Sequence, residues 1–273
     1  MDRGRLGAIP RLVPNSGRPI FRLSKVSAKT WHRLCYVENV IQANCRTQFT
    51  ADDFTFVVQV LAKSQRDAVS LVTLLSDEEE RDAILDHDLI YNSLVDQSGC
   101  LRVSAAFYFY VLTRRVLRRV SLDERALTDY VAAMLLAFSH INQLQAPQDN
   151  QVTARSFSYV SDMMMRLNTC SPEQAYLLRT HMANYTLFLS GMFAERVTSH
   201  AERRGAPGLS FYEAVGQASF LCIAQHPQAK RTEHHAIFEM LGNEFRRVRL
   251  ALNNLADTLL HLHATPSILI RPT

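Results

Sequence analysis

Five short segments of this 273-residue sequence carry the pattern that starts an α-helix. Each places a Ser or Thr three positions before an acidic residue or a Gln. In such a capping box, the hydroxyl accepts a hydrogen bond from the third helical N–H, and the later side chain reaches back to the start of the helix. The five segments are Thr50–Asp53, Ser76–Glu79, Ser121–Glu124, Ser171–Gln174 and Ser210–Glu213. These repeated start signals predict a chain built from α-helices.

Apolar residues recur at intervals of three or four positions behind several of these signals. One stripe runs from Leu122 to Ile141 and another from Ala175 to Met192. This period is typical of helices that bury one face, and no segment shows the alternation of a β-strand. We therefore expect an all-α fold, a compact multi-helix bundle of about nine or ten helices.

The N-terminal segment differs from the rest of the chain. Three Gly and three Pro fall within residues 1–28, which predicts an irregular arm. We expect residues 29–273 to form a single α-helical domain, with a subdomain break near residues 145–151. Residues 1–33 hold eight Lys or Arg and one Asp, a net charge of +7, while the whole chain has +4 and the other 240 residues therefore −3. This distribution favours an acidic partner for the arm over a body that coats nucleic acid.

The C-terminal segment shows the most regular pattern. From Phe238 to Leu262, apolar residues fill the a and d positions of four heptads, and several flanking positions are small. Such a seam is expected either in a central helix of the bundle or between two copies of the chain. The residues proposed for an interaction seam are Phe245, Val248, Leu252, Leu255 and Leu259.

Cysteine usage and hydropathy restrict the environment of the protein. The five cysteines are far apart, their number is odd, and no CxxC motif occurs. This pattern favours free thiols in a reducing compartment, so we expect a cytoplasmic protein. No apolar run approaches the roughly 20 residues that a membrane-spanning helix needs. The start of the chain lacks the apolar core of a secretory signal, although its Arg-rich, acid-poor composition loosely resembles a transit peptide.

The segment from Arg203 to Gly216, RRGAPGLSFYEAVG, admits two interpretations. As a corner between helices, Gly205 would end one helix and Ser210 would cap the next. As a weak anion site, Arg203 and Arg204 would act with the free N–H groups near Gly208 and Ser210. The phosphate-binding motifs of nucleotide-binding loops are missing. We favour the corner.

A metal-dependent hydrolase is one alternative function. His87–Asp88 is a dipeptide found in helical metal-dependent phosphohydrolases, and His32 with Asp123 or Asp129 would complete a ligand set. The dipeptide lies in an acidic segment that is also typical of a solvent-exposed helix face. We therefore expect no metal and no cofactor.

Four arginines at helical spacing raise a third possibility. The strip Arg114–Arg119 could lie along a nucleic-acid backbone. Acidic blocks at Ser76–Asp82 and Ser121–Arg125 make internal ion pairing the favoured use. Taken together, these patterns predict an intracellular interaction or scaffold protein that self-associates and is not an enzyme. Its basic arm would bind acidic partners, and the hydrolase and the nucleic-acid binder remain the alternatives.

Overall fold

A computed structural model describes residues 41–96, 103–144, 152–232 and 234–264 of the chain. Within these ranges the protein is all-α, with thirteen α-helices, one 3-10 helix and no strand, which confirms the expected fold class. The helices are η1 (Cys45–Gln48), α2 (Ala51–Leu61), α3 (Gln65–Leu74), α4 (Glu78–Leu85), α5 (Asp88–Asp96), α6 (Ala105–Arg119), α7 (Arg125–Leu144), α8 (Val152–Leu167), α9 (Pro172–Met192), α10 (Ala194–Arg204), α11 (Leu209–Ala224), α12 (Pro227–Arg231), α13 (His235–Asn243) and α14 (Phe245–Ala264).

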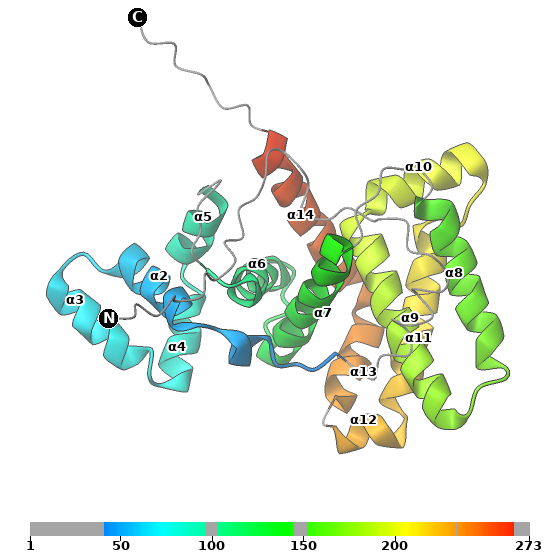
Figure 1. The fold of residues 1–273 in the computed structure, drawn as a ribbon, viewed down its shortest axis with the longest axis horizontal. Coiled ribbons are helices and arrows are strands. Elements are labelled where there is room, and N and C mark those ends of the chain that lie inside the picture. Colours follow the sequence, from blue (N-terminus) through cyan, green and yellow to red (C-terminus); the bar gives the residue numbers. More distant parts are fainter. Residues whose placement is uncertain (1–40, 97–102, 145–151, 233, 265–273) are drawn as a thin grey trace, which may run out of the picture.

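The helices are arranged around α14 (Figure 1). This helix packs against α6 on one side and α9 on the other, while α9 also packs against α11. The short helices α2, α3, α4 and α5 form one end of the molecule, and α8 and α10 lie at the opposite end. The basic arm and the expected break at 145–151 fall outside the described residues. No described helix is both long enough and apolar enough to cross a bilayer.

Two of the five predicted helix starts are confirmed as capping boxes. Thr50 caps α2 together with Asp53, and Ser171 caps α9 together with Gln174. In α9, Pro172 follows the cap at a position where the missing N–H of proline is not needed. Asp53 has a second role, since its carboxylate also accepts hydrogen bonds from the backbone and hydroxyl of Ser104 at the start of α6.

The other three start signals were wrong in detail. Asp77 and not Ser76 caps α4, because an Asp side chain at that position is an equally good acceptor for the first N–H groups. Ser121 has a positive φ of 57° and belongs to the end of α6. There the next residue, Leu122, donates its N–H back to the carbonyl of Leu117, as in the motif that terminates helices. At α11, Gly208 is the N-cap and Ser210 lies inside the first turn.

The number of helices exceeds the expected nine or ten, partly because the long C-terminal helix is divided. It breaks at Glu244 into α13 and α14. Gly242 and Asn243, both weak helix formers, precede this break. A Cβ atom on Gly242 would lie 2.6 Å from the side chain of Leu221, so the missing side chain permits close packing of α13 on α11.

The proposed interaction seam lies inside the molecule. Its five side chains are buried within the single chain, in the core that α14 shares with α6 and α9. This burial agrees with the central bundle helix, the first of the two interpretations of the heptad pattern. Gly191 of α9 allows α14 to approach closely, since a Cβ atom there would lie 2.8 Å from the Cβ atom of Leu252.

Candidate binding site at the N-terminal helices

The corner between α10 and α11 contains the proposed anion site. Gly205 ends α10 in the left-handed conformation, with φ 63°, as the sequence predicts. Arg203 and Arg204 are exposed in the last turn of α10, and Ser210 is exposed at the start of α11. Ser210 does not cap α11, and Glu213 turns instead toward Arg249, whose Nε lies 2.5 Å from its carboxylate. Anion binding at this corner stays a prediction.

The residues considered for a metal centre serve other interactions. His87 accepts a hydrogen bond at Nδ1 from the N–H of Leu89, a local turn at the start of α5. Asp88 pairs with Arg115, and Asp123 pairs with Arg114. Among the described residues, no three His, Cys, Asp or Glu side chains are arranged to hold a metal ion. His32 lies outside those residues.

The arginine strip of α6 is used for internal ion pairing, as the acidic blocks indicated. The Arg114 guanidinium is buried and donates from Nε and Nη2 to both oxygens of Asp86, at 2.8 and 3.0 Å. Arg118 lies 3.6 Å from a carboxylate oxygen of Asp86. The guanidinium groups of Arg115 and Arg119 lie over the ring of Tyr91, at 5.5 and 5.8 Å from its centre. These contacts leave the strip poorly suited to bind phosphates.

A second part of the same network connects η1, α4 and α7. The backbone N–H of Arg46 donates to Asp129 at 2.8 Å, and its guanidinium contacts both Asp129 and Asp82. Arg125 completes the cluster from α7. Its Nε lies 3.3 Å from a carboxylate oxygen of Asp82, and its Nη2 donates to Asp86 at 3.2 Å. Residues far apart in the sequence are thus joined by charge-assisted hydrogen bonds, which are stronger than neutral ones.

Two carboxylates of this network have opposite pKa shifts. Burial alone would raise the pKa of Asp86, but the hydrogen bond and charge of Arg114, with the charges of Arg125 and Arg118, lower it below its ordinary value. For Asp129, burial dominates and raises the pKa, because Arg46 opposes it alone and the neighbouring charge of Asp82 adds to the rise. The contacts with guanidinium groups therefore outweigh burial at Asp86, whereas burial outweighs them at Asp129.

The one buried cysteine among the described residues has no sign of nucleophilic activation. Cys45 donates its thiol hydrogen to the carbonyl of Ala106 at 3.3 Å. Burial, followed by the charge of Asp129, raises the pKa of this thiol to about 12. The thiolate needed for nucleophilic attack is therefore disfavoured at neutral pH.

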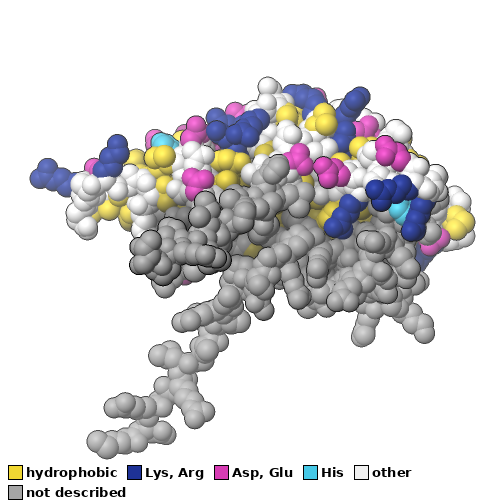
Figure 2. Space-filling model, turned by 90° about the horizontal axis from the view of Figure 1, so that it is seen from above, with side chains coloured by type: hydrophobic (Ala, Val, Ile, Leu, Met, Phe, Trp, Pro, Cys, Tyr) yellow, Lys and Arg dark blue, Asp and Glu magenta, His cyan; other side chains and the backbone are white. Residues whose placement is uncertain are grey.

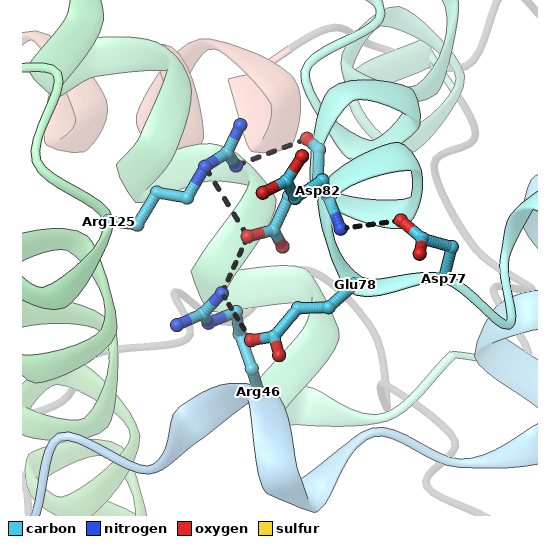
Figure 3. Close-up of a pocket in the computed structure, with 6 residues that line it drawn as sticks. Arg46, Asp77, Glu78, Asp82 and Arg125 are labelled. Carbon is cyan, nitrogen blue, oxygen red and sulfur yellow. Dashed lines mark hydrogen bonds and ion pairs between the residues drawn. The ribbon is translucent and has the colours of Figure 1, made fainter.

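An open pocket of about 670 Å³ lies beside this network (Figure 3). Its lining comprises two guanidinium groups and four carboxylates: Arg46, Arg125, Asp77, Glu78, Glu79 and Asp82. Figure 3 shows that Arg46 and Arg125 approach the same oxygen of Asp82, which is Oδ2. The other oxygen, Oδ1, is buried and accepts no hydrogen bond from the described chain. We regard this pocket as the candidate binding site.

Sequence reasoning recognised the acidic block Ser76–Asp82 only as a partner for the arginines of α6. It missed Arg46 and Arg125, which no motif distinguishes from the other 24 arginines and lysines outside the strip. Comparisons with protein-family models, with curated proteins and with solved structures each find no match. The chemistry of the site is therefore interpreted from its geometry.

Proposed function

We propose that this chain is a helical protein-interaction module whose docking surface is formed by α3 and the first turn of α4. The observation that supports this proposal is the exposure of apolar side chains on α3. None of the ten residues of this helix is buried. Val69, Val72 and Leu74 expose 62%, 57% and 41% of their surface.

Two of these side chains form a patch. Val69 and Val72 are three residues apart and so lie on one face of the helix, whereas Leu74, two residues after Val72, points to the opposite face. In Figure 2, the end of the molecule formed by α2, α3 and α4 displays hydrophobic side chains among charged ones. Single exposed apolar residues are common on protein surfaces, but a contiguous group of them on one helix marks an interaction surface.

Charge indicates which partner fits this surface. The helix α4 follows α3 after three residues, and four exposed acids, Asp77, Glu78, Glu79 and Glu80, form its N-cap and first turn. A segment with both apolar and basic residues would cover the valines and meet the acids at the same time. The proposed partner is therefore an apolar and basic segment of another protein, held by apolar burial and oriented by charge.

The other predicted functions are less well supported. The C-terminal seam is buried within the single chain, and self-association stays a prediction. Binding of an acidic partner by the basic arm rests on residues outside the described part of the chain. The hydrolase lacks an assembled ligand set among the described residues. Of the four strip arginines of the nucleic-acid alternative, Arg114, Arg115 and Arg118 are engaged in ion pairs.

A random peptide library displayed on phage tests the proposed docking surface. We expect the selected peptides to combine Lys or Arg with apolar residues and to lose binding to the variant Val69→Asp/Val72→Asp. The matched control is Met164→Asp/Met165→Asp, which introduces the same two charges at exposed methionines of α8. Equal binding of the selected peptides to both variants, or selection of no peptide at all, would contradict the proposed function.

A further inference from the structure

The geometry of the pocket between η1, α4 and α7 points to a more specific ligand. We propose that it receives the ammonium or guanidinium group of a Lys or Arg side chain from the docked partner. This inference rests on the proposed function and names the chemistry that the acidic part of the docking surface recognises.

The two arginines of the pocket are already engaged by the protein. Arg46 uses Nε and Nη1 on Asp129 and Asp82, and its Nη1 lies 3.9 Å from Glu78. Arg125 donates from Nη1 to the Asp82 carbonyl at 3.1 Å and from Nη2 to Asp86. An anion entering the pocket would have to compete with these carboxylates for most of the guanidinium donors. The arrangement therefore disfavours an anionic ligand.

The Asp82 carboxylate, in contrast, has one oxygen atom that accepts no hydrogen bond from the described chain. The residue is only 6% exposed and lines the pocket. Its Oδ2 takes contacts from both arginines, whereas Oδ1 receives no hydrogen bond from the described chain. A buried carboxylate oxygen without a donor is unfavourable, and such an atom beside a pocket indicates the place of a missing donor. An ammonium or guanidinium group is a donor of the matching charge.

The rim of the pocket adds further acceptors. Glu78 exposes 73% of its side chain and Glu79 is also exposed, so both carboxylates can reorient toward an entering cation. The lining holds four carboxylates against two guanidinium groups, which leaves the pocket with an excess of negative charge. Asp77 contributes charge while it caps α4 by accepting from the N–H groups of Glu79 and Glu80.

The dimensions of the pocket agree with this ligand. Its volume of about 670 Å³ is in the range of small-molecule sites, which is ample for one long basic side chain and its own backbone. The pocket includes the start of α4, which follows α3 after three residues of the chain. We propose that one partner segment reaches both features. The pocket would then select for a basic residue at one position of that segment.

A mutant cycle between protein and peptide tests the inference. The probe is the tightest phage-selected peptide, measured by fluorescence polarisation, together with copies in which each Lys or Arg is replaced in turn by Met. We expect one replacement to weaken binding about tenfold or more in the parent protein and much less in Glu78→Gln/Glu79→Gln. The control Glu173→Gln/Glu202→Gln removes the same number of charges at exposed acids of α9 and α10, outside the docking surface and the pocket lining, and should behave like the parent.

Small cations test the pocket without a peptide. Methylguanidinium chloride should raise the melting temperature of the parent above that in sodium chloride at equal ionic strength, and Glu78→Gln/Glu79→Gln should remove the difference. Circular dichroism shows whether the variant remains folded. The inference is overturned if neither the peptide affinity in the mutant cycle nor the melting temperature in methylguanidinium chloride depends on Glu78 and Glu79. Peptides that bind through the valines but not the pocket would overturn it while leaving the proposed function intact.

Discussion

At the scale of single residues, the described structure concentrates its charged contacts on a few carboxylates. Asp86 receives three arginines, while Asp53 connects the starts of α2 and α6 from a fully buried position. These carboxylates stabilise the fold only while they are paired, because removal of a partner leaves an unpaired charge in an apolar environment. Substitution of a single acid therefore affects several helices at once.

Asp86 should make stability sensitive to acid. Its folded-state pKa is lowered, so its contribution to the free energy of unfolding is complete above the unfolded-state value and is lost as pH falls through the folded-state pKa. We expect Asp86→Asn to lower stability by about 2–3 kcal/mol at pH 7 and by much less in strong acid. Urea unfolding across this pH range measures the difference. Asp162→Asn, at an exposed position, should show no such trend.

At the scale of helices, the sequence predicted the features that follow local rules and failed to predict those that depend on tertiary contacts. The apolar stripes of α7 and α9 were predictable because they follow a fixed period. Helix starts were predictable only where no neighbour competed for the role: Ser121 is used to end α6, and Asp77 replaces Ser76. The pocket was not predictable, since sequence shows the charges but not which Arg meets which Asp across 36 or 83 residues.

Two serines at predicted helix starts should respond differently to substitution. Ser171→Ala removes the acceptor of the capping box of α9 and should lower stability by about 0.5–2 kcal/mol. Ser210→Ala should change it by less than about 0.5 kcal/mol, since Ser210 lies after the N-cap and Ala is the better helix former. Thermal or urea unfolding compares the two. A larger loss for Ser210→Ala would restore it as the cap of α11.

Close contact between α11 and α14 depends on Gly216. A Cβ atom at this position would lie 2.2 Å from the ring of Phe245, too close for any real contact. We expect Gly216→Ala to lower stability by about 1–3 kcal/mol through overpacking. The same substitution in a Phe245→Leu background should cost less, because the smaller side chain makes room. Equal losses in the two backgrounds would show that Phe245 is not the obstacle.

At the scale of the whole molecule, one helix joins the two halves of the described chain. α14 contacts α6 of the N-terminal half and α9 of the C-terminal half, and its apolar face is buried along most of the described length. The described part of the chain therefore shares one continuous core, in which the regular C-terminal heptads serve as an internal surface.

Leucines on opposite faces of α14 provide the test of this arrangement. Leu252 is fully buried and Leu250 is 44% exposed. We expect Leu252→Ala to lower the free energy of unfolding by about 2–5 kcal/mol, and Leu250→Ala to have little effect. For an internal core, the loss should not vary with protein concentration. A melting temperature that rises with concentration would instead indicate that the seam is shared between two copies.

The ion pairs of Arg46 also have a consequence for the path by which the chain folds. Its partners lie 36 and 83 residues further along the chain, so these pairs require η1, α4 and α7 to be brought together before they can form. Contacts between distant segments tend to form late, after local helices and the first apolar contacts. Loss of the Arg46 side chain should therefore accelerate unfolding while leaving the refolding rate almost unchanged. The network would then form late in folding and slow the unfolding of the N-terminal helices once they have assembled.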